Sequence, residues 1–371
     1  MLAGAVADRG VNTTPGLGTE VVDAHDRGDT RPGRSTRPTI HDVARAAGVT
    51  IGTVSKALNH RGQLRPETRE RVLAEAARLE FRPNDLIKSL LRGRTYTVGL
   101  LTTDYFGRFT MPLLAGIEDA LGAAEILVFL CNIRDDPDRE RKVIASLLAK
   151  QVDGIIVTGR RTDPRPAVDI GRSTVPLVYA NTRVPDDDAL CLLPDDAGGA
   201  RLAVGHLLDT GRRRVVSITG PAHWDAVAQR RQGMTTALQE RGLDLAEDQV
   251  WCGPWSEGWG YEAVDQVLAR EPAVDAIFCG SDQIARGVID CLRELGRRIP
   301  EEIAIVGFDN WEIIAEATRP PLTTVDLNLH DLGREAAHRL LAMVSGERQT
   351  GTVRLPCSLI VRASTGDTPP R

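Results

Sequence analysis

Residues 38–59 read PTIHDVARAAGVTIGTVSKALN, and this stretch decides the fold of the amino-terminal part of the chain. It predicts two short helices joined by a tight turn at Gly48, because glycine readily adopts the left-handed conformation that closes a helix. Thr39 is placed to cap the first helix, with Asp42 as its capping-box partner three positions on. Thr50 is placed to cap the second helix. This is the build of a helix-turn-helix that reads DNA.

Hydrophobic spacing predicts the rest of the amino-terminal module. The residues that share one face of the first helix, and should be buried, are Ile40, Val43, Ala44 and Ala47. A third helix is expected from Pro66 to about Glu80, since proline favours the first turn of a helix. Its buried face should hold Val72, Leu73, Ala76 and Leu79.

Charge and composition limit the possible functions. The chain carries a net charge of −5, yet residues 38–95 hold 11 Lys and Arg against 6 Asp and Glu. A basic module on an acidic chain fits binding to a phosphate backbone at one end. Residues 1–37 are poor in large apolar side chains, so we expect a disordered tail there. They carry no export signal, the chain has no run of about 18 apolar residues, and the six cysteines form no CxxC pair. We therefore expect a cytoplasmic protein with no disulfide, metal site or cofactor.

From Thr95 onward, short apolar runs alternate with helical stretches. The runs typical of buried parallel strands are Val98–Leu101, Ile126–Leu130, Gly154–Val157, Leu177–Tyr179, Val215–Ile218, Ala276–Cys279 and Ile303–Phe308. Helices are expected over Met111–Leu121, Arg139–Lys150, Ala197–Leu208, Tyr261–Ala269 and Gln283–Leu295. The alternation predicts an α/β architecture of doubly wound parallel sheets in two lobes, with a cleft between them. Because ligands of such sheets bind beyond the carboxyl ends of the strands, the residues after each strand are binding candidates.

Six motifs, in this order, resemble those of the LacI/GalR family of bacterial transcription regulators. They are DVARAAGVTIGTVSKALN (42–59), RPETRERVLAEAARLEFRPN (65–84), ITGP (218–221), GSDQIARG (280–287), IVGFDN (305–310) and PPLTTV (320–325). The resemblance implies a small all-α helix-turn-helix headpiece over 38–83 and a hinge helix over 84–94. It also implies a two-lobed α/β core over 95–371, like that of the periplasmic sugar-binding proteins, and a dimer or tetramer on a palindromic operator in double-stranded DNA. Because no obvious heptad repeat follows Leu355, we expect a homodimer rather than a tetramer.

The resemblance also implies how DNA is contacted. Ile51, Gly52 and Lys56 match the base-reading positions, where Lys56 could donate to guanine and Ile51 could contact a thymine methyl group. Gly52 replaces the usual larger polar residue, so backbone approach or shape readout is expected there. Residues placed for phosphate contacts are Thr39, Thr50, Thr53, Ser55, Asn59 and His60, of which Thr39 and Thr50 also cap helices. Leu90 matches a leucine that the family wedges into the minor groove, although its apolar run alone favours a core residue, and Lys88 would add a backbone contact.

The effector candidates follow the predicted strands. Those taken from the loops are Asp104, Tyr105, Phe109, Asn132, Arg160 and Asp309. By resemblance, Arg230 matches a position that clamps sugar hydroxyls, and Trp255 matches an aromatic position that packs on the ligand. Asp282 either contacts the ligand or caps the helix that follows it. For Trp224, Trp259 and Trp311, ligand contact and packing stay equally open. Carboxylate, guanidinium and amide groups beside aromatic rings suit a sugar, because each hydroxyl both donates and accepts.

Together these observations predict a sequence-specific transcription repressor whose operator affinity is controlled by a small carbohydrate. Closure of the lobes around the ligand would alter the spacing of the hinge segments, with the ligand acting either as inducer or as co-repressor. An enzyme on this fold would be expected to carry a motif such as GxGxxG after a strand, GxSxG or HExxH, and none is found. A sugar-binding protein that does not bind DNA would lack residues 38–93 and carry a signal peptide.

Overall fold

The computed structural model of the 371-residue chain describes residues 38–58, 62–81, 94–122, 125–244, 246 and 249–366. The chain divides into two compact units, Met1–Asn84 and Asp85–Arg371, which we call the headpiece and the core. The tail predicted over 1–37 lies outside the described residues, and so does the hinge helix predicted over 84–94, apart from Arg94.

Three short helices form the described part of the headpiece: α1 (Ile40–Ala47), α2 (Ile51–Leu58) and α3 (Pro66–Arg78). The capping box predicted for α1 is present, since the Thr39 hydroxyl accepts from the Asp42 N–H and the Asp42 carboxylate accepts from the Thr39 N–H. Gly48 follows α1 with a φ of 64°, a left-handed conformation that is easily reached without a Cβ atom. The two predicted helices and their turn are therefore confirmed.

Burial in the headpiece agrees with the prediction in part, since Ile40 and Leu79 are only partly buried and Leu73 is exposed. Val43, Val54 and Val72, one from each helix, are fully buried in one cluster. The prediction that Leu73 is buried is wrong, because 37% of this residue is exposed. The buried positions of α3 are Val72 and Ala76, and each residue along a helix turns by about 100°, so the position after Val72 leaves that face.

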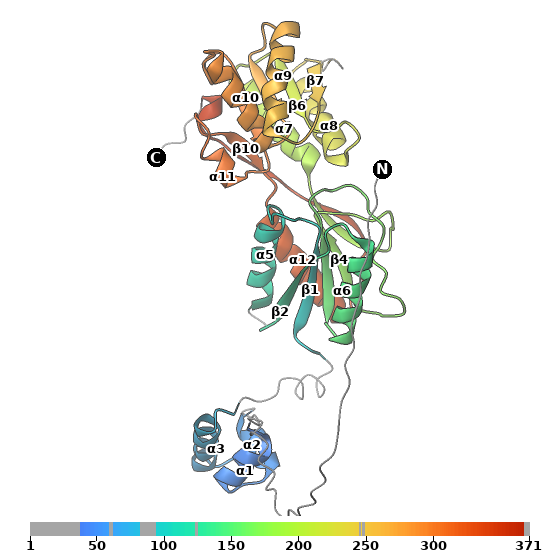
Figure 1. The fold of residues 1–371 in the computed structure, drawn as a ribbon, viewed down its shortest axis with the longest axis vertical. Helices are drawn as coiled ribbons and strands as arrows, with labels where there is room; N and C mark the ends of the chain where they lie inside the picture. The colour runs from blue at the N-terminus through green and yellow to red at the C-terminus, as the bar shows by residue number, and fades with distance from the viewer. Residues whose placement is uncertain are drawn as a thin grey trace, which may run out of the picture. The chain divides into compact units, whose positions relative to one another are not determined.

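The first sheet of the core holds six parallel strands in the order β11-β5-β4-β3-β1-β2 (Figure 1). Its strands are β1 (Thr97–Thr102), β2 (Leu127–Asn132), β3 (Gly154–Thr158), β4 (Leu177–Ala180), β5 (Leu190–Pro194) and β11 (Gly351–Leu355). Helices α5 (Thr110–Gly122) and α12 (Leu329–Val344) pack together on one face, and α6 (Pro137–Ala149) covers the other. We call this sheet with its three helices the N-lobe.

The second sheet has the order β12-β10-β9-β8-β6-β7, with only β12 antiparallel to its neighbour. Its strands are β6 (Val215–Thr219), β7 (Val250–Cys252), β8 (Ala276–Cys279), β9 (Ala304–Phe308), β10 (Thr323–Asp326) and β12 (Ser358–Ile360). Helices α7 (Asp196–Asp209) and α8 (Asp225–Gln239) pack on one face, and α9 (Glu257–Arg270) and α10 (Asp282–Glu294) on the other. The short helices α11 (Glu312–Ala315) and η2 (Ala363–Thr365) complete what we call the C-lobe.

These two sheets confirm the predicted doubly wound α/β architecture. Every predicted strand and helix of the core is present. The elements that were not predicted include β5, β7, β10, β11, α8, α11 and α12. The prediction that the run Ile126–Leu130 is buried is wrong. Its strand, β2, stands at the edge of the sheet, and Leu127 and Leu130 are 66% and 46% exposed.

Candidate functional site

The outer face of α2 presents the side chains that the sequence assigned to base reading. Ile51 is 41% exposed, and Gly52 and Lys56 are also exposed, whereas Val54 and Ala57 turn into the headpiece core. A Cβ atom added at Gly52 would come no closer than 3.8 Å to any neighbour, the Thr50 hydroxyl oxygen. Packing within the headpiece therefore does not require glycine at this position.

Hydroxyl groups at the start of α1 and α2 serve as helix caps. The Thr50 hydroxyl accepts from the Thr53 N–H at 3.3 Å and lies 3.0 Å from the Thr53 hydroxyl. The Thr39 hydroxyl donates to the Asp42 carboxylate at 2.6 Å, and this hydrogen bond lowers the pKa of Asp42. Contacts of these residues with DNA remain predictions, and Ser55 is exposed beside them. The predicted contacts Asn59, His60, Lys88 and Leu90 lie outside the described residues.

A cavity of about 350 Å³, here called the first cavity, lies where strands of both sheets end. Its lining comes from the segments that follow β1 and β3 to β10, including the start of α8 after β6. The polar residues that line it are Asp104, Arg108, Arg160, Arg161, Thr162, Asn181, Asp196, Arg230, Ser281, Gln283 and Asp309. The carboxyl ends of the strands thus form the site, as expected for parallel α/β sheets.

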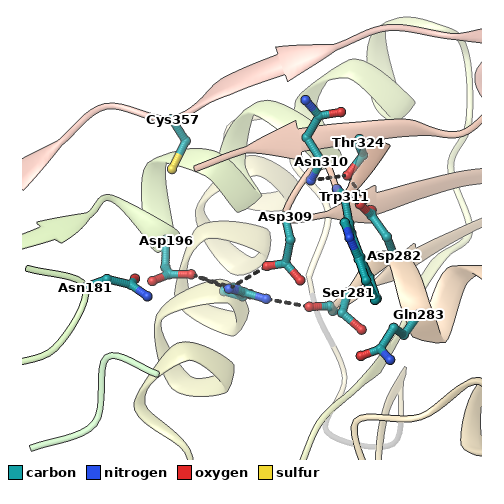
Figure 2. A network of polar contacts seen from close by, with 12 residues as sticks. Asn181, Asp196, Ser281, Asp282, Gln283, Asp309, Asn310, Trp311, Thr324 and Cys357 are labelled. Atoms are coloured by element: carbon teal, nitrogen blue, oxygen red, sulfur yellow. Dashed lines mark hydrogen bonds and ion pairs between the residues drawn. The ribbon is translucent and has the colours of Figure 1, made fainter. Parts of the chain in front are cut away.

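Arg230 is the buried centre of the first cavity. Its Nε and Nη2 atoms lie 2.8 and 2.7 Å from Oδ1 of Asp196, and its Nη1 donates to the carbonyl of Gly280. Its Nη2 also lies 3.6 Å from Oδ1 of Asp309. Figure 2 shows the Asp196 and Asp309 carboxylates pointing toward the same space. The guanidinium stacks 3.7 Å from the centre of the Phe308 ring, which fixes its plane.

A second guanidinium, that of Arg108, reaches from the N-lobe to the C-lobe. It donates to the Asp309 carboxylate and, at 3.0 Å, to the side-chain oxygen of Gln283. Its Cζ lies 4.9 Å from the Phe109 ring centre and 4.7 Å from that of Trp311. The Asp309 carboxylate is therefore shared by one cation from each lobe, so the state of this residue is tied to how the lobes close.

Burial is the largest influence on the pKa of each buried carboxyl group around this cluster. It raises the pKa of Asp196 and of Asp309, while the neighbouring guanidinium groups act in the opposite direction. Burial, together with the charge of Asp309, raises the pKa of Asp282 to about 7. The Asp282 carboxylate accepts from the Trp311 N–H at 2.6 Å and from the Thr324 hydroxyl at 2.5 Å. Asp282 therefore supports the loop that carries Asp309.

That loop holds an unusual backbone. Asp309 has a φ of 102° and Asn310 a φ of 46°, in a region that residues with a Cβ atom rarely adopt. The conformation is fixed from several sides, because the Asp309 N–H donates to the Val325 carbonyl at 2.8 Å and the Asn310 amide donates to Asp326 at 2.9 Å. Such strain is typical of functional loops that a rigid scaffold holds in place.

Aromatic rings form the remaining walls of the first cavity. Trp255 and Trp224 meet edge to face with ring centres 5.7 Å apart, and both line the cavity with Trp311. Trp259 does not line it, and its indole N–H donates to the Thr219 carbonyl at 3.0 Å. Any Cβ atom at Gly220 would overlap the Trp255 ring, so glycine is required there. The buried Trp255 indole N–H finds no hydrogen-bond partner among the described residues. It is thus an unsatisfied donor on a residue that lines the cavity.

Most of the predicted effector residues meet in the first cavity. Those that line it are Asp104, Phe109, Arg160, Arg230, Trp255 and Asp309. Asp104 uses its carboxylate within the protein, where it accepts from the N–H groups of Phe109 at 2.8 Å and of Thr110 at 3.0 Å. Its role is to shape the loop that presents Arg108.

Three predicted residues, Tyr105, Asn132 and Asp282, do not line the first cavity, and their expected placement is corrected here. Tyr105 is 68% exposed and turns its ring to Phe106. The Asn132 amide donates to the Asp104 carbonyl at 3.2 Å, so it braces the same loop from outside. For Asp282, the structure favours the supporting alternative over direct contact.

The sequence reasoning missed Asp196 and Gln283 as lining residues. Asp196 follows the run LCLLP, which is strand β5, and recognition of that strand would have drawn attention to it. Gln283 stands beside Asp282 in the motif GSDQIARG and was hidden by the stronger signal of its neighbour.

Comparisons with known proteins agree with this architecture. Residues 39–84 match the family of bacterial regulatory proteins of the lacI type, and residues 204–365 match a periplasmic binding protein-like domain. The transcriptional regulator CelR of Thermobifida fusca is 36% identical over 342 residues, which cover 89% of this chain and 99% of that protein. The chain belongs to the LacI family of bacterial transcription regulators.

Two solved structures are similar in fold. The transcriptional regulator CelR–cellobiose complex gives a TM-score of 0.62 at 31% identity, covering 88% of this chain and 100% of that one. The lac repressor dimer bound to operator and the anti-inducer ONPF gives 0.74 at 26% identity, covering 89% and 99%. These similar proteins are transcription regulators rather than enzymes. No helix in the described part of the chain is long and apolar enough to span a membrane.

Proposed function

We propose that this regulator binds a palindromic operator as a homodimer and that a neutral carbohydrate in the first cavity controls its affinity for that operator. The observation that carries the proposal is the cluster of Arg108, Asp309, Arg230 and Asp196 at the floor of a cavity walled by indole rings. The cluster joins two cations to two carboxylates, so it presents hydrogen-bonding groups with little net charge.

The chemistry of the first cavity favours a sugar. Each sugar hydroxyl can donate to a carboxylate and accept from a guanidinium, and the apolar faces of a pyranose pack on indole rings. A volume of about 350 Å³ is at the lower end of the range for small-ligand sites, which suits one or two sugar units. The cellobiose complex of the CelR relative supports this ligand class.

DNA recognition is assigned to the exposed face of α2. We propose that Lys56 and Ile51 read base edges, and that Thr39, Thr50, Thr53 and Ser55 set the register through phosphate contacts. The proposal extends to Asn59, Lys88 and the minor-groove wedge Leu90 from the sequence pattern alone. With no side chain at Gly52, α2 offers few base contacts, so a second headpiece on the other half-site supplies the specificity.

An exposed apolar edge supports the homodimer. On β2, the edge strand of the N-lobe, Leu127, Phe129 and Leu130 are 66%, 37% and 46% exposed. An uncovered edge strand with large apolar side chains is an aggregation hazard unless a partner covers it. A second copy of the chain is the partner that a palindromic site requires.

The mechanism follows from the position of Arg108. Because this residue pairs with Asp309 and Gln283 across the lobes, a sugar that hydrogen-bonds to the cluster changes the free energy of lobe closure. The start of the core is attached to the N-lobe and should move with it, because the Arg94 side chain donates to the Val344 carbonyl, at the end of α12, at 3.1 Å. Differential binding of a ligand to open and closed states is what allosteric control requires.

The experiment is a fluorescence-anisotropy titration of labelled duplexes tiled across the DNA upstream of the chain's own coding region, with and without a panel of sugars. We expect one palindromic duplex to bind specifically and one sugar class to change its apparent Kd. Lys56→Ala should weaken the specific complex, whereas Arg141→Ala, a change at an exposed position of α6, should not. If no duplex binds specifically, the operator role is refuted. If no sugar changes the Kd of the specific duplex, the effector role is refuted.

A further inference from the structure

A second cavity, of about 450 Å³, adjoins the first on the N-lobe side. It is lined by the segments after β1, β2, β3 and β4 and by the loop before α8. The two cavities share two lining residues, Arg161 and Trp224, so a single wall stands between them. This wall consists of the contact between these two side chains, in which the Arg161 guanidinium lies 5.0 Å from the centre of the Trp224 ring.

This wall is easily displaced. Arg161 is exposed and has no carboxylate within ion-pair distance among the described residues. A cation–π contact at an exposed site is weak, so a ligand that stacks on Trp224 can replace the Arg161 guanidinium. Trp224 would then offer one continuous aromatic surface to a ligand that occupies both cavities.

Two buried oxygen atoms at the second cavity have no hydrogen-bond partner among the described residues. One is the hydroxyl of Thr158, a residue with no exposed surface at the end of β3, and the other is Oδ2 of Asp163. The second oxygen of Asp163 is already used, since it accepts from the Asp225 N–H at 3.0 Å. Polar atoms that are buried without a partner are costly, so such atoms beside a cavity point to a ligand that satisfies them.

The remaining charges at the second cavity are balanced within the protein. Asp135 lies 3.5 Å from Arg160, Glu140 pairs with Arg165, and Asp136 caps α6 by accepting from two backbone N–H groups. Of the two lining arginines, Arg165 is paired and only Arg161 has no carboxylate partner among the described residues. An anionic ligand would therefore meet the four lining carboxylates, those of Asp135, Asp136, Glu140 and Asp163, with a single guanidinium to pair with. A neutral ligand that donates hydroxyl hydrogens fits the site.

We propose that the second cavity is an additional subsite for a further neutral sugar unit, so that the effector is an oligosaccharide that extends from the first cavity past Trp224. This assignment rests on the proposed carbohydrate effector. In it, hydroxyls of the added unit donate to the Thr158 and Asp163 oxygens, and its ring packs against Trp224 on the side that Arg161 now covers.

The chain provides a matched pair of variants for the test. Thr158 lines only the second cavity and Thr162 only the first, and each is buried with a hydroxyl that finds no partner among the described residues. Thr158→Val and Thr162→Val therefore remove the same group, with nearly the same shape, from the two cavities. Circular dichroism and thermal unfolding confirm that each full-length variant is folded.

The measurement is isothermal titration calorimetry of the full chain with the gluco-, malto- and xylo-oligosaccharide series, from one to four units. In the series that binds, we expect affinity to rise beyond the length that fills the first cavity. Thr158→Val should weaken only these longer ligands, by about 2- to 12-fold for one lost hydrogen bond. Thr162→Val should weaken all lengths that bind by a similar factor.

The outcomes separate this proposal from the one on which it rests. If short sugars bind but longer ones bind no more tightly, or if Thr158→Val affects all lengths equally or none, the subsite is refuted and the carbohydrate effector stands. If no sugar of any length binds to the folded protein, the proposed effector class fails, and the subsite fails with it.

Discussion

Replacement of Asp309 by asparagine is the sharpest perturbation of the effector site. The two Asp309 oxygens face two different guanidinium groups, since Oδ2 accepts from Arg108 and Oδ1 lies 3.6 Å from Arg230. In Asp309→Asn one oxygen becomes an NH2 group, which cannot accept, so one guanidinium loses its partner. Arg230 keeps Asp196, whereas Arg108 keeps only the Gln283 oxygen at 3.0 Å.

The expected loss can be worked from these contacts. A hydrogen bond to a charged group contributes about 1.5–3 kcal/mol, so the effector Kd should rise about 10- to 150-fold as Arg108 loses its fixed position. Calorimetric titration of the effector measures this change. Asp138→Asn is the control, because Asp138 pairs with Arg141 on an exposed helix surface where such pairs contribute little. An unchanged effector Kd in folded Asp309→Asn would refute the assigned role of the cluster.

Three further predictions concern stability and DNA binding. Asp282, with a pKa raised to about 7, favours the folded state at low pH, and this contribution is lost as pH rises through 7. The free energy of unfolding, measured with denaturant, should therefore fall between pH 6 and pH 8 by about 1 kcal/mol more in the wild type than in Asp282→Asn. An equal change in the two proteins would contradict this. Thr39→Ala should cost the headpiece about 1 kcal/mol through loss of its cap, measured by thermal unfolding, and an unaltered melting curve would count against the capping role. Gly52→Ala should stabilise α2 by about 0.5–1 kcal/mol; operator affinity, measured by anisotropy, should fall if the DNA backbone approaches Gly52 closely and stay constant if it does not.

The sequence predicted the elements whose signals are local. The capping box at Thr39 and the left-handed Gly48 were readable because both depend on residues within one turn of helix. Most strands of the two sheets were readable as apolar runs, and the rule that ligands bind after parallel strands then placed Arg160 and Asp309 in one site. Arg230, inside α8, was found only through the family resemblance.

The errors arose where burial depends on distant neighbours. The β2 run is as apolar as its neighbours, yet its place at the sheet edge leaves Leu127 exposed, and strand order is not written in a single run. Asp104 and Asp282 follow strands as ligand contacts would, but each satisfies its carboxylate on backbone N–H groups that only the folded loop brings near. A carboxylate that binds a ligand and one that binds a loop look alike in the sequence.

The central claim is that sugar binding in the core and operator binding by the headpiece are coupled. The most direct test measures the operator Kd with and without saturating sugar, and the sugar Kd with and without saturating operator. We predict that both ratios are equal and differ from one by a factor of about 5 to 150, above one for an inducer and below one for a co-repressor, as a coupling free energy of about 1–3 kcal/mol requires. Specific binding of both ligands with both ratios equal to one would contradict the claim.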